Sequence, residues 1–294
     1  MSCFYSNYRR AFRQRLERAA PLQVAATHAC RADMEDAFVY TDQAKARARQ
    51  TVVEAMQSLD FGHKEVIVRV NELGSPWFDD DLRACLQARP HAIVPAKTRT
   101  EDDLRAVDQR LDELGMPDDQ RLWVGIETAS AVLRCWQIAS ASPRVELLRF
   151  GLGDYTVTMH GQFSDDNQHL LVPLTLVLAT ARALGLEATA AAVVFSDFRN
   201  LDLVRQQAAL MRRLAYDGAT VIHPAHVEPV NDVFTPSSDE VAGALRQEAA
   251  LEQSGDAPLV LDGQLVEMVS VKLARRTLAI ARKLGLSTDA APTT

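Results

Sequence analysis

Two short apolar runs decide the fold of this chain: Leu122-Trp-Val-Gly-Ile-Glu127-Thr128 and Leu147-Leu-Arg-Phe-Gly-Leu-Gly-Asp154. Runs of about four to eight apolar residues between turn signals are typical of strands buried on both faces. Each run ends in a carboxylate, Glu127 in the first and Asp154 in the second. In open α/β sheets and barrels, active sites lie at the carboxyl ends of the strands. The two runs therefore predict an acidic centre at one edge of a parallel sheet.

Strand-like and helix-like segments alternate along the chain without a linker, which implies a parallel sheet with right-handed crossovers. The expected strands are residues 32–39, 65–71, 91–97, 121–128, 147–154, 188–198 and 219–224. A weaker first strand, at 2–6 or 22–28, would complete a (β/α)8 barrel. We therefore predict an α/β fold with a TIM barrel over residues 1–235. A C-terminal helical extension with a short turn at 258–263 is expected over residues 236–294.

Composition narrows the class of protein. The chain has 294 residues, 47% hydrophobic content and a net charge of −7, which argues against general nucleic-acid or membrane-surface binding. No apolar stretch reaches the roughly 18 residues of a membrane span. The four cysteines are scattered and form no Cys-x-x-Cys pair, which suits free thiols in a reducing cytoplasm. We expect a cytoplasmic protein with a small-molecule substrate and no nucleic-acid or membrane partner.

Glu127 and Asp154 are candidate metal ligands. Two carboxylates that converge at a barrel rim can hold a hard cation such as Mg²⁺, which takes oxygen ligands and completes its shell with water and substrate. The alternative is that each carboxylate caps the helix that follows it. The pairing of two such acids favours a Mg²⁺ site.

Other charged residues gather at the ends of the expected strands. Asp33, Glu35 and Asp36 place three acids within four residues, which is costly unless a cation or hydrogen bonds compensate. Arg69 interrupts an apolar strand, and its planar fork suits either a substrate carboxylate or one of these acids. Lys97 is either a functional cation at the rim or a solvated lysine.

A series of motifs along the chain carries a family resemblance. The motifs are Asp33-x-Glu35-Asp36, Val68-Arg69-Val70-Asn71, Pro95-x-Lys97, Ile126-Glu127-Thr128, Gly151-x-Gly153-Asp154, Asp197-Phe198-Arg199, Ile222-His223-Pro224 and Leu261-Asp262-Gly263. In this order they resemble the HpcH/HpaI aldolase and citrate lyase beta subunit family. Members of this family are TIM barrels, commonly trimers or hexamers. They use Mg²⁺ to cleave or form carbon–carbon bonds in acyl-CoA thioesters or small oxo acids.

The resemblance implies binding roles by position. Glu127 and Asp154 would be the metal ligands, and Glu127 would also contact the substrate. Arg69 would clamp a substrate carboxylate, with Lys97 assigned to the same binding site.

The resemblance also implies a catalytic set. Glu35 and Asp36 would lie near the metal-bound waters. Glu267 stands where the family has a lid aspartate, five positions after Asp262, and would reach a neighbouring subunit's active site. The general base would be either Glu267 of a partner or a carboxylate of the 33–36 cluster.

We therefore predict a Mg²⁺-dependent carbon–carbon lyase or aldolase that works as a homo-trimer or homo-hexamer. Its substrate would be a β-hydroxy acyl-CoA thioester of the citramalyl, malyl or citryl type, or a small 4-hydroxy-2-oxo acid. The alternative is a non-catalytic subunit that binds an acyl thioester or oxo acid within a larger complex.

Overall fold

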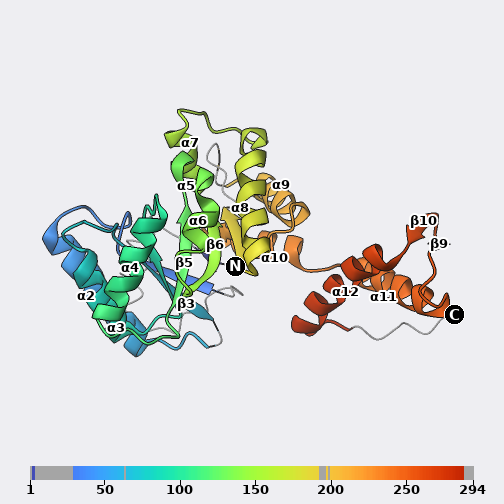
Figure 1. Ribbon diagram of the computed structural model, residues 1–294, viewed down its shortest axis with the longest axis horizontal. Coiled ribbons are helices and arrows are strands. Elements are labelled where there is room, and N and C mark those ends of the chain that lie inside the picture. The colour runs from blue at the N-terminus through green and yellow to red at the C-terminus, as the bar shows by residue number, and fades with distance from the viewer. Residues whose placement is uncertain (1, 4–28, 63, 192–196, 198, 288–294) are drawn as a thin grey trace. The chain divides into compact units, whose positions relative to one another are not determined.

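The computed structural model describes residues 2–3, 29–62, 64–191, 197 and 199–287 (Figure 1). Contacts between residues divide the chain into two compact units, 1–230 and 231–294. This division falls inside helix α10 (Val227–Phe234), whereas the boundary expected from sequence, 235/236, falls just after that helix.

The strands of the first unit form a closed parallel barrel in which sequence neighbours pair and β1 also pairs with β8. The strands are β1 (Ser2–Cys3), β2 (Ala29–Asp33), β3 (Glu65–Val70), β4 (Ala92–Pro95), β5 (Arg121–Ile126), β6 (Val145–Phe150), β7 (Glu187–Ala191) and β8 (Gly218–Val221). The (β/α)8 barrel predicted from the apolar runs is thus confirmed. Of the two candidates for the first strand, part of 2–6 forms β1, and 22–28 lies outside the described residues.

Helices follow the strands and lie around the barrel (Figure 1). They are α2 (Asp42–Ser58), α3 (Phe78–Ala88), α4 (Glu101–Glu113), α5 (Ala129–Leu133), α6 (Cys135–Ala139), α7 (Leu152–Thr158), η1 (Gln168–Leu170), α8 (Leu171–Leu184), α9 (Leu201–Arg213) and η2 (Pro224–His226), followed by α10. Local signals explain where several of them begin. Thr41, Thr100 and Thr128 each cap a helix, because the hydroxyl oxygen accepts a hydrogen bond from a backbone N–H of the first turn.

Strands β2 to β6 and β8 end earlier than the sequence predicted, and for two of them the early end places an acid of the candidate site. β2 ends at Asp33, where the Glu35 N–H donates to Asp33 Oδ1 and turns the chain out of the sheet. β6 ends at Phe150, and Asp154 lies in the first turn of α7 instead of at a strand end. An acid in the first turn of a helix is favoured by the helix dipole.

The second unit is a helical hairpin with a small β-hairpin between its helices. It comprises α11 (Ser238–Gln253), β9 (Leu259–Leu261), β10 (Gln264–Val266) and α12 (Met268–Lys283). The segment expected as a turn at 258–263 contains strand β9 and the two-residue connection to the antiparallel strand β10. Its Asp262 and Gly263 have φ of 51° and 77°, the left-handed pair that a tight two-residue hairpin requires.

The barrel interior is filled by apolar side chains from facing strands. One buried cluster joins Ala29, Ile67, Ala92, Val94, Trp123 and Leu147. These residues come from β2 to β6, so the cluster ties the strands that carry the charged residues described below.

Leu147→Ala should lower the free energy of unfolding by about 2–5 kcal/mol, because it leaves a cavity in this close-packed cluster. Urea denaturation followed by circular dichroism measures the change. Leu273→Ala is the matched control, because Leu273 is 66% exposed and the same substitution there removes little packing. Equal effects of the two substitutions would contradict a packed barrel interior.

Candidate functional site

The charged residues singled out in the first unit follow strands of the barrel at their carboxyl ends. Asp33 is the last residue of β2, Arg69 lies in β3, and Lys97 follows β4. Glu127 is the first residue after β5, and Asp154 follows β6. Because parallel strands end at the same side of a barrel, these side chains share one rim.

Arg69 is the centre of an ion-pair cluster. Its Nε and Nη2 donate to the two oxygens of Asp33 at 3.0 and 2.6 Å, a bidentate pair between β2 and β3. Its Nη1 lies 2.9 Å from Glu35 Oε2 and 3.3 Å from Asp36 Oδ2. Arg69 is buried, and burial would lower the pKa of its guanidinium, but Asp33 and the other two acids raise it overall. The sequence left two possible partners for Arg69, a substrate carboxylate or the neighbouring acids. The structure shows ion pairs with the acids.

Glu35 and Asp36 are further held by side chains from two other segments. Lys97 Nζ lies 3.0 Å from Glu35 Oε1, so this lysine is paired and not simply solvated. The hydroxyl of Tyr40 donates to Asp36 Oδ1 at 2.6 Å and to Glu35 Oε1 at 3.1 Å. Burial raises the pKa of Glu35, against the opposing charge of Arg69. For Asp36, burial would raise the pKa, but hydrogen bonds with Glu35 and Tyr40 lower it overall.

A fully buried lysine, Lys45, holds the backbone of the loop that carries Glu35 and Asp36. Lys45 Nζ donates to the carbonyls of Met34 at 3.0 Å and Glu35 at 2.8 Å. The Met34 carbonyl also accepts from Asn71 Nδ2 at 3.0 Å. Sequence analysis did not find Lys45 or Tyr40. For Lys45 a signal existed, because it belongs to the buried face of α2 together with Ala48, Val52 and Ala55.

Glu127 lies in a narrow slot between two strands. A Cβ added to Gly151 would lie 2.6 Å from Glu127 Cγ and 2.8 Å from Oε1, and one added to Gly125 would lie 3.0 Å from Oε1. Position 151 therefore has no room for a side chain unless Glu127 moves, and position 125 has little. At the end of the slot, Arg149 Nη1 donates to Glu127 Oε1 at 2.7 Å. Arg149 was missed from sequence, although it interrupts an apolar strand just as Arg69 does.

Asp154 differs from the other acids of the rim. Burial raises the pKa of its carboxyl, and the negative charges of Glu127 and Asp36 raise it further. Within the described part of the chain, no ion pair to its carboxylate is found within 4.0 Å. The rim thus contains one acid whose charge is opposed by like charges and not directly paired.

These donors fit a hard cation that keeps water or substrate ligands. Glu127 and Asp154 offer carboxylate oxygens only, the ligand type that Mg²⁺ prefers. Among the described residues, no group of three or more His, Cys, Asp or Glu side chains is arranged to hold a metal by itself. Mg²⁺ is commonly bound by one or two carboxylates together with water and substrate oxygens, so two carboxylates are enough for such a site.

The predicted lid residue belongs to the second unit. Glu267 begins α12, and its N–H donates to Ser270 Oγ at 3.0 Å. It is half-buried within its own unit.

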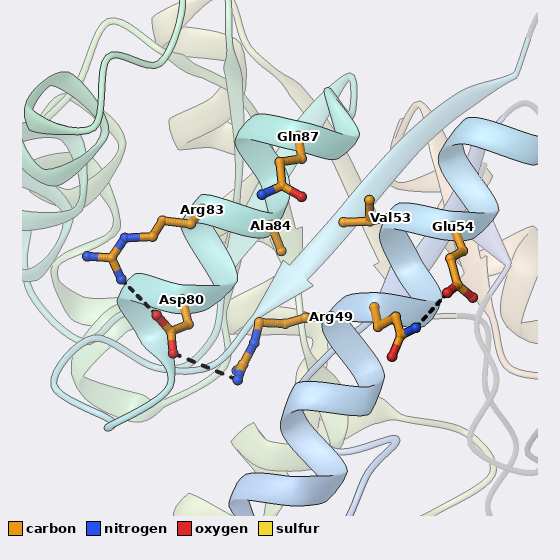
Figure 2. Close-up of a pocket in the computed structure, with 8 residues that line it drawn as sticks. Arg49, Val53, Glu54, Asp80, Arg83, Ala84 and Gln87 are labelled. Atoms are coloured by element: carbon orange, nitrogen blue, oxygen red, sulfur yellow. Dashed lines mark hydrogen bonds and ion pairs between the residues drawn. The ribbon is translucent and has the colours of Figure 1, made fainter.

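A separate groove of about 380 Å³ lies between α2 and α3, lined by Arg49, Gln50, Val53, Glu54, Asp80, Arg83, Ala84 and Gln87 (Figure 2). Arg83 pairs with Asp80 at 2.7 Å, and Arg49 also reaches Asp80 at 3.8 Å, so charges on the groove wall neutralise each other. None of the acids of the rim lines this groove.

The first unit is thus an α/β barrel whose rim carries several paired acids and one carboxylate, Asp154, that has no ion pair among the described residues. The HpcH/HpaI aldolase/citrate lyase family matches residues 23–224. The chain belongs to this family, as the motifs predicted. No helix of the described chain has the length and apolar character needed to cross a bilayer.

Two relatives illustrate the range of names in the family. The chain is 35% identical over 255 residues to a (3S)-malyl-CoA thioesterase from Cereibacter sphaeroides strain KD131, covering 86% of each protein. It is 30% identical over 257 residues to the citrate lyase subunit beta of Leuconostoc mesenteroides subsp. cremoris, covering 85% of this chain and 84% of the relative.

A solved structure shares the fold. Protein CitE from Mycobacterium tuberculosis, in complex with magnesium, acetoacetate and coenzyme A, superposes with a TM-score of 0.75. The match covers 96% of this chain and 97% of CitE at 20% identity.

Gly151→Ala should lower the free energy of unfolding by about 1–3 kcal/mol, because the new methyl group overlaps the side chain of Glu127. In a Glu127→Ala background the same change should cost much less, so a double-mutant cycle in urea measures the contact. Gly243→Ala, at an open position in α11, serves as the control. Additive effects of Gly151→Ala and Glu127→Ala would contradict the slot.

Proposed function

We propose that this protein is a Mg²⁺-dependent carbon–carbon lyase of the citrate lyase beta type. Its substrate is a β-hydroxy acyl-CoA thioester of the malyl, citramalyl or citryl type, or a small 4-hydroxy-2-oxo acid. The observation that carries the proposal is that two carboxylates, Glu127 and Asp154, lie near each other at the rim of the barrel, where burial and then the negative charge of Glu127 raise the pKa of Asp154. The names of the relatives, and the magnesium and coenzyme A bound to CitE, support it.

Glu127 and Asp154 would hold the Mg²⁺ ion. When bound, Mg²⁺ polarises substrate oxygens and stabilises negative charge that develops as the carbon–carbon bond breaks. The slot formed by Gly125, Gly151 and Arg149 keeps the Glu127 carboxylate in place, so little reorganisation is needed at that ligand.

Arg69 orients the substrate carboxylate in this proposal. Asp33 holds the guanidinium plane by its bidentate pair, while Glu35 and Asp36 lie on the Nη1 side. A guanidinium fixed in this way loses little freedom when it also binds the substrate carboxylate. Lys97, one-third exposed, adds positive charge beside it.

The proton of the substrate hydroxyl passes to Glu35 or Asp36. A raised pKa brings the Glu35 carboxylate nearer to the range of an efficient general base. Asp33 is unsuited to this role, because both of its carboxylate oxygens already accept hydrogen bonds from Arg69. Glu267 of a partner subunit is the other candidate base.

With malyl-CoA as the substrate, the cleavage proceeds in two steps. The hydroxyl loses its proton, the bond between the hydroxyl-bearing carbon and the methylene carbon breaks, and glyoxylate forms. The electron pair stays on the acyl half as an enolate, which takes up a proton to give acetyl-CoA. Aldol cleavage of a 4-hydroxy-2-oxo acid follows the same order and releases an oxo acid.

Thioester hydrolysis is a second candidate, favoured by the 35% identity to a protein named (3S)-malyl-CoA thioesterase. Here water would attack the thioester carbonyl of malyl-CoA, and malate and free coenzyme A would form. The same base at Glu35 or Asp36 would take the proton from water.

Malyl-CoA incubated with the protein and Mg²⁺ should yield glyoxylate and acetyl-CoA, with no free thiol. Chromatography and a thiol reagent measure the products. Glu127→Gln should abolish both Mg²⁺ binding and turnover, because it removes a ligand charge with little change of shape. Glu146→Gln is the control, because Glu146 lies near the amino end of β6, paired with His91 and Trp123.

Three results would redirect the proposal. Malate and free coenzyme A as products would identify a thioesterase. Binding without turnover, across the acyl-CoA esters and the oxo acids, would identify a non-catalytic subunit. Unchanged metal affinity in both Glu127→Gln and Asp154→Asn would show that these two residues are not the metal ligands.

We also propose that the protein assembles as a homo-trimer or homo-hexamer. Helices α5, α6 and α8 contact one another and expose large apolar side chains. Leu133 in α5 is 80% exposed and Val172 in α8 is 71% exposed. Trp136 in α6 and Leu176 in α8 are exposed as well. Exposed apolar groups clustered on packed helices are typical of surfaces that another subunit covers.

A shared site predicts complementation between subunits. An inactive Glu127→Gln chain and an inactive Glu267→Gln chain should regain partial activity after co-assembly, because one hybrid site can combine an intact rim with an intact lid. Activity is measured after mixing, with mass spectrometry to verify mixed oligomers. No recovery from verified mixed oligomers would leave the base within residues 33–36.

A further inference from the structure

A buried ion pair joins Arg149 to Glu127, the candidate metal ligand that follows β5. Arg149 Nη1 lies 2.7 Å from Glu127 Oε1, with the side chains only 12% and 7% exposed. The two residues come from paired strands, because Gly125 and Arg149 are register partners and Glu127 lies two residues beyond Gly125. The pair is therefore built into the β5–β6 ladder and is not a mobile surface contact.

The slot restricts where the Glu127 carboxylate can go. A Cβ at Gly151 would overlap Glu127 Cγ and Oε1, and a Cβ at Gly125 would make a tight contact with Oε1. Between these two glycines, Arg149 donates a hydrogen bond to Glu127 Oε1. Oε2 is the oxygen that this pair leaves for another ligand.

Charges of opposite sign flank this carboxylate. Among the cations, Arg31 lies near Arg69 and Arg149, because burial and then the charges of these two arginines lower the pKa of Arg31, while Glu127 acts to raise it. Among the acids, Asp154 experiences the negative charge of Glu127. Glu127 is therefore paired with Arg149 and acts electrostatically on Asp154, which has no ion pair within 4.0 Å among the described residues.

We infer that Arg149 is a positioning residue that serves as the resident counter-ion of Glu127 and weakens the binding of a free divalent cation to Glu127 and Asp154. The inference rests on the proposed metal site and concerns its regulation. A divalent cation on Glu127 must bind close to the guanidinium, and like charges repel strongly in a buried setting. The metal-free site is thereby kept neutral at Glu127, and an anionic substrate, which adds negative charge, favours retention of the cation.

The test uses Mn²⁺ alone, titrated into the full-length protein and followed by the electron paramagnetic resonance signal of free Mn²⁺. Arg149→Met should bind Mn²⁺ about tenfold more tightly than the wild type, because the cation then compensates a buried carboxylate that has lost its partner. Arg149→Lys keeps the charge and should restore an affinity close to that of the wild type.

A second buried arginine provides the matched control. Arg144, at the other end of β6, is 6% exposed and pairs with Asp108 at 3.0 Å and Asp112 at 2.8 Å. Arg144→Met should destabilise the fold without changing Mn²⁺ affinity, which separates loss of a buried ion pair from an effect on the site. If Arg149→Met does not fold, Arg149→Gln, which keeps an N–H donor, replaces it.

Unchanged or weaker Mn²⁺ binding by a folded, neutral variant at Arg149 would overturn the inference. That result differs from failure of the metal site itself. If the metal site fails, neither the wild type nor any Arg149 variant binds Mn²⁺, and Glu127→Gln has no effect on the titration.

Discussion

The buried guanidinium of Arg69 is the interaction on which the acidic rim depends. Three acids follow β2 within four residues, and their mutual repulsion and desolvation would be prohibitive without a cation among them. Asp33 and Arg69 are register partners on β2 and β3, so the barrel itself aligns the bidentate pair. Loss of one partner of a buried pair typically costs about 3–5 kcal/mol. Lys45 completes the support by fixing the carbonyls of the loop that carries Glu35.

The rest of the rim follows the same electrostatic logic with a different distribution of partners. Glu127 has its own arginine on the neighbouring strand, and Glu35 shares a lysine with the cluster. Asp154 receives no comparable partner among the described residues, and like charges raise its pKa. In the proposed function, this one acid without a close partner attracts a cation, and the surrounding arginines and lysine orient an anion.

Fold and chemistry remain separate questions in this family. One barrel architecture is shared by relatives named for thioester hydrolysis and by relatives named for citrate lyase, so the barrel alone does not choose between them. Both reactions begin with a base that removes a proton from an oxygen, and both benefit from a cation near a carbonyl. What differs is the atom that the proton comes from and the bond that breaks. The products therefore identify the reaction more directly than the scaffold does.

The sequence by itself determined the order of the strands, the closed barrel and the rim positions of Asp33, Glu127 and Lys97. Apolar runs at regular intervals allow few alternatives once crossovers are short and right-handed. Tertiary structure alone decided the partners: Arg69 with Asp33, Arg149 with Glu127, and Lys45 beneath Glu35. It also moved Asp154 from a strand end onto helix α7. Periodicity reports which residues are buried, whereas ion pairing depends on the register between strands far apart in sequence, and that register exists only after the barrel closes.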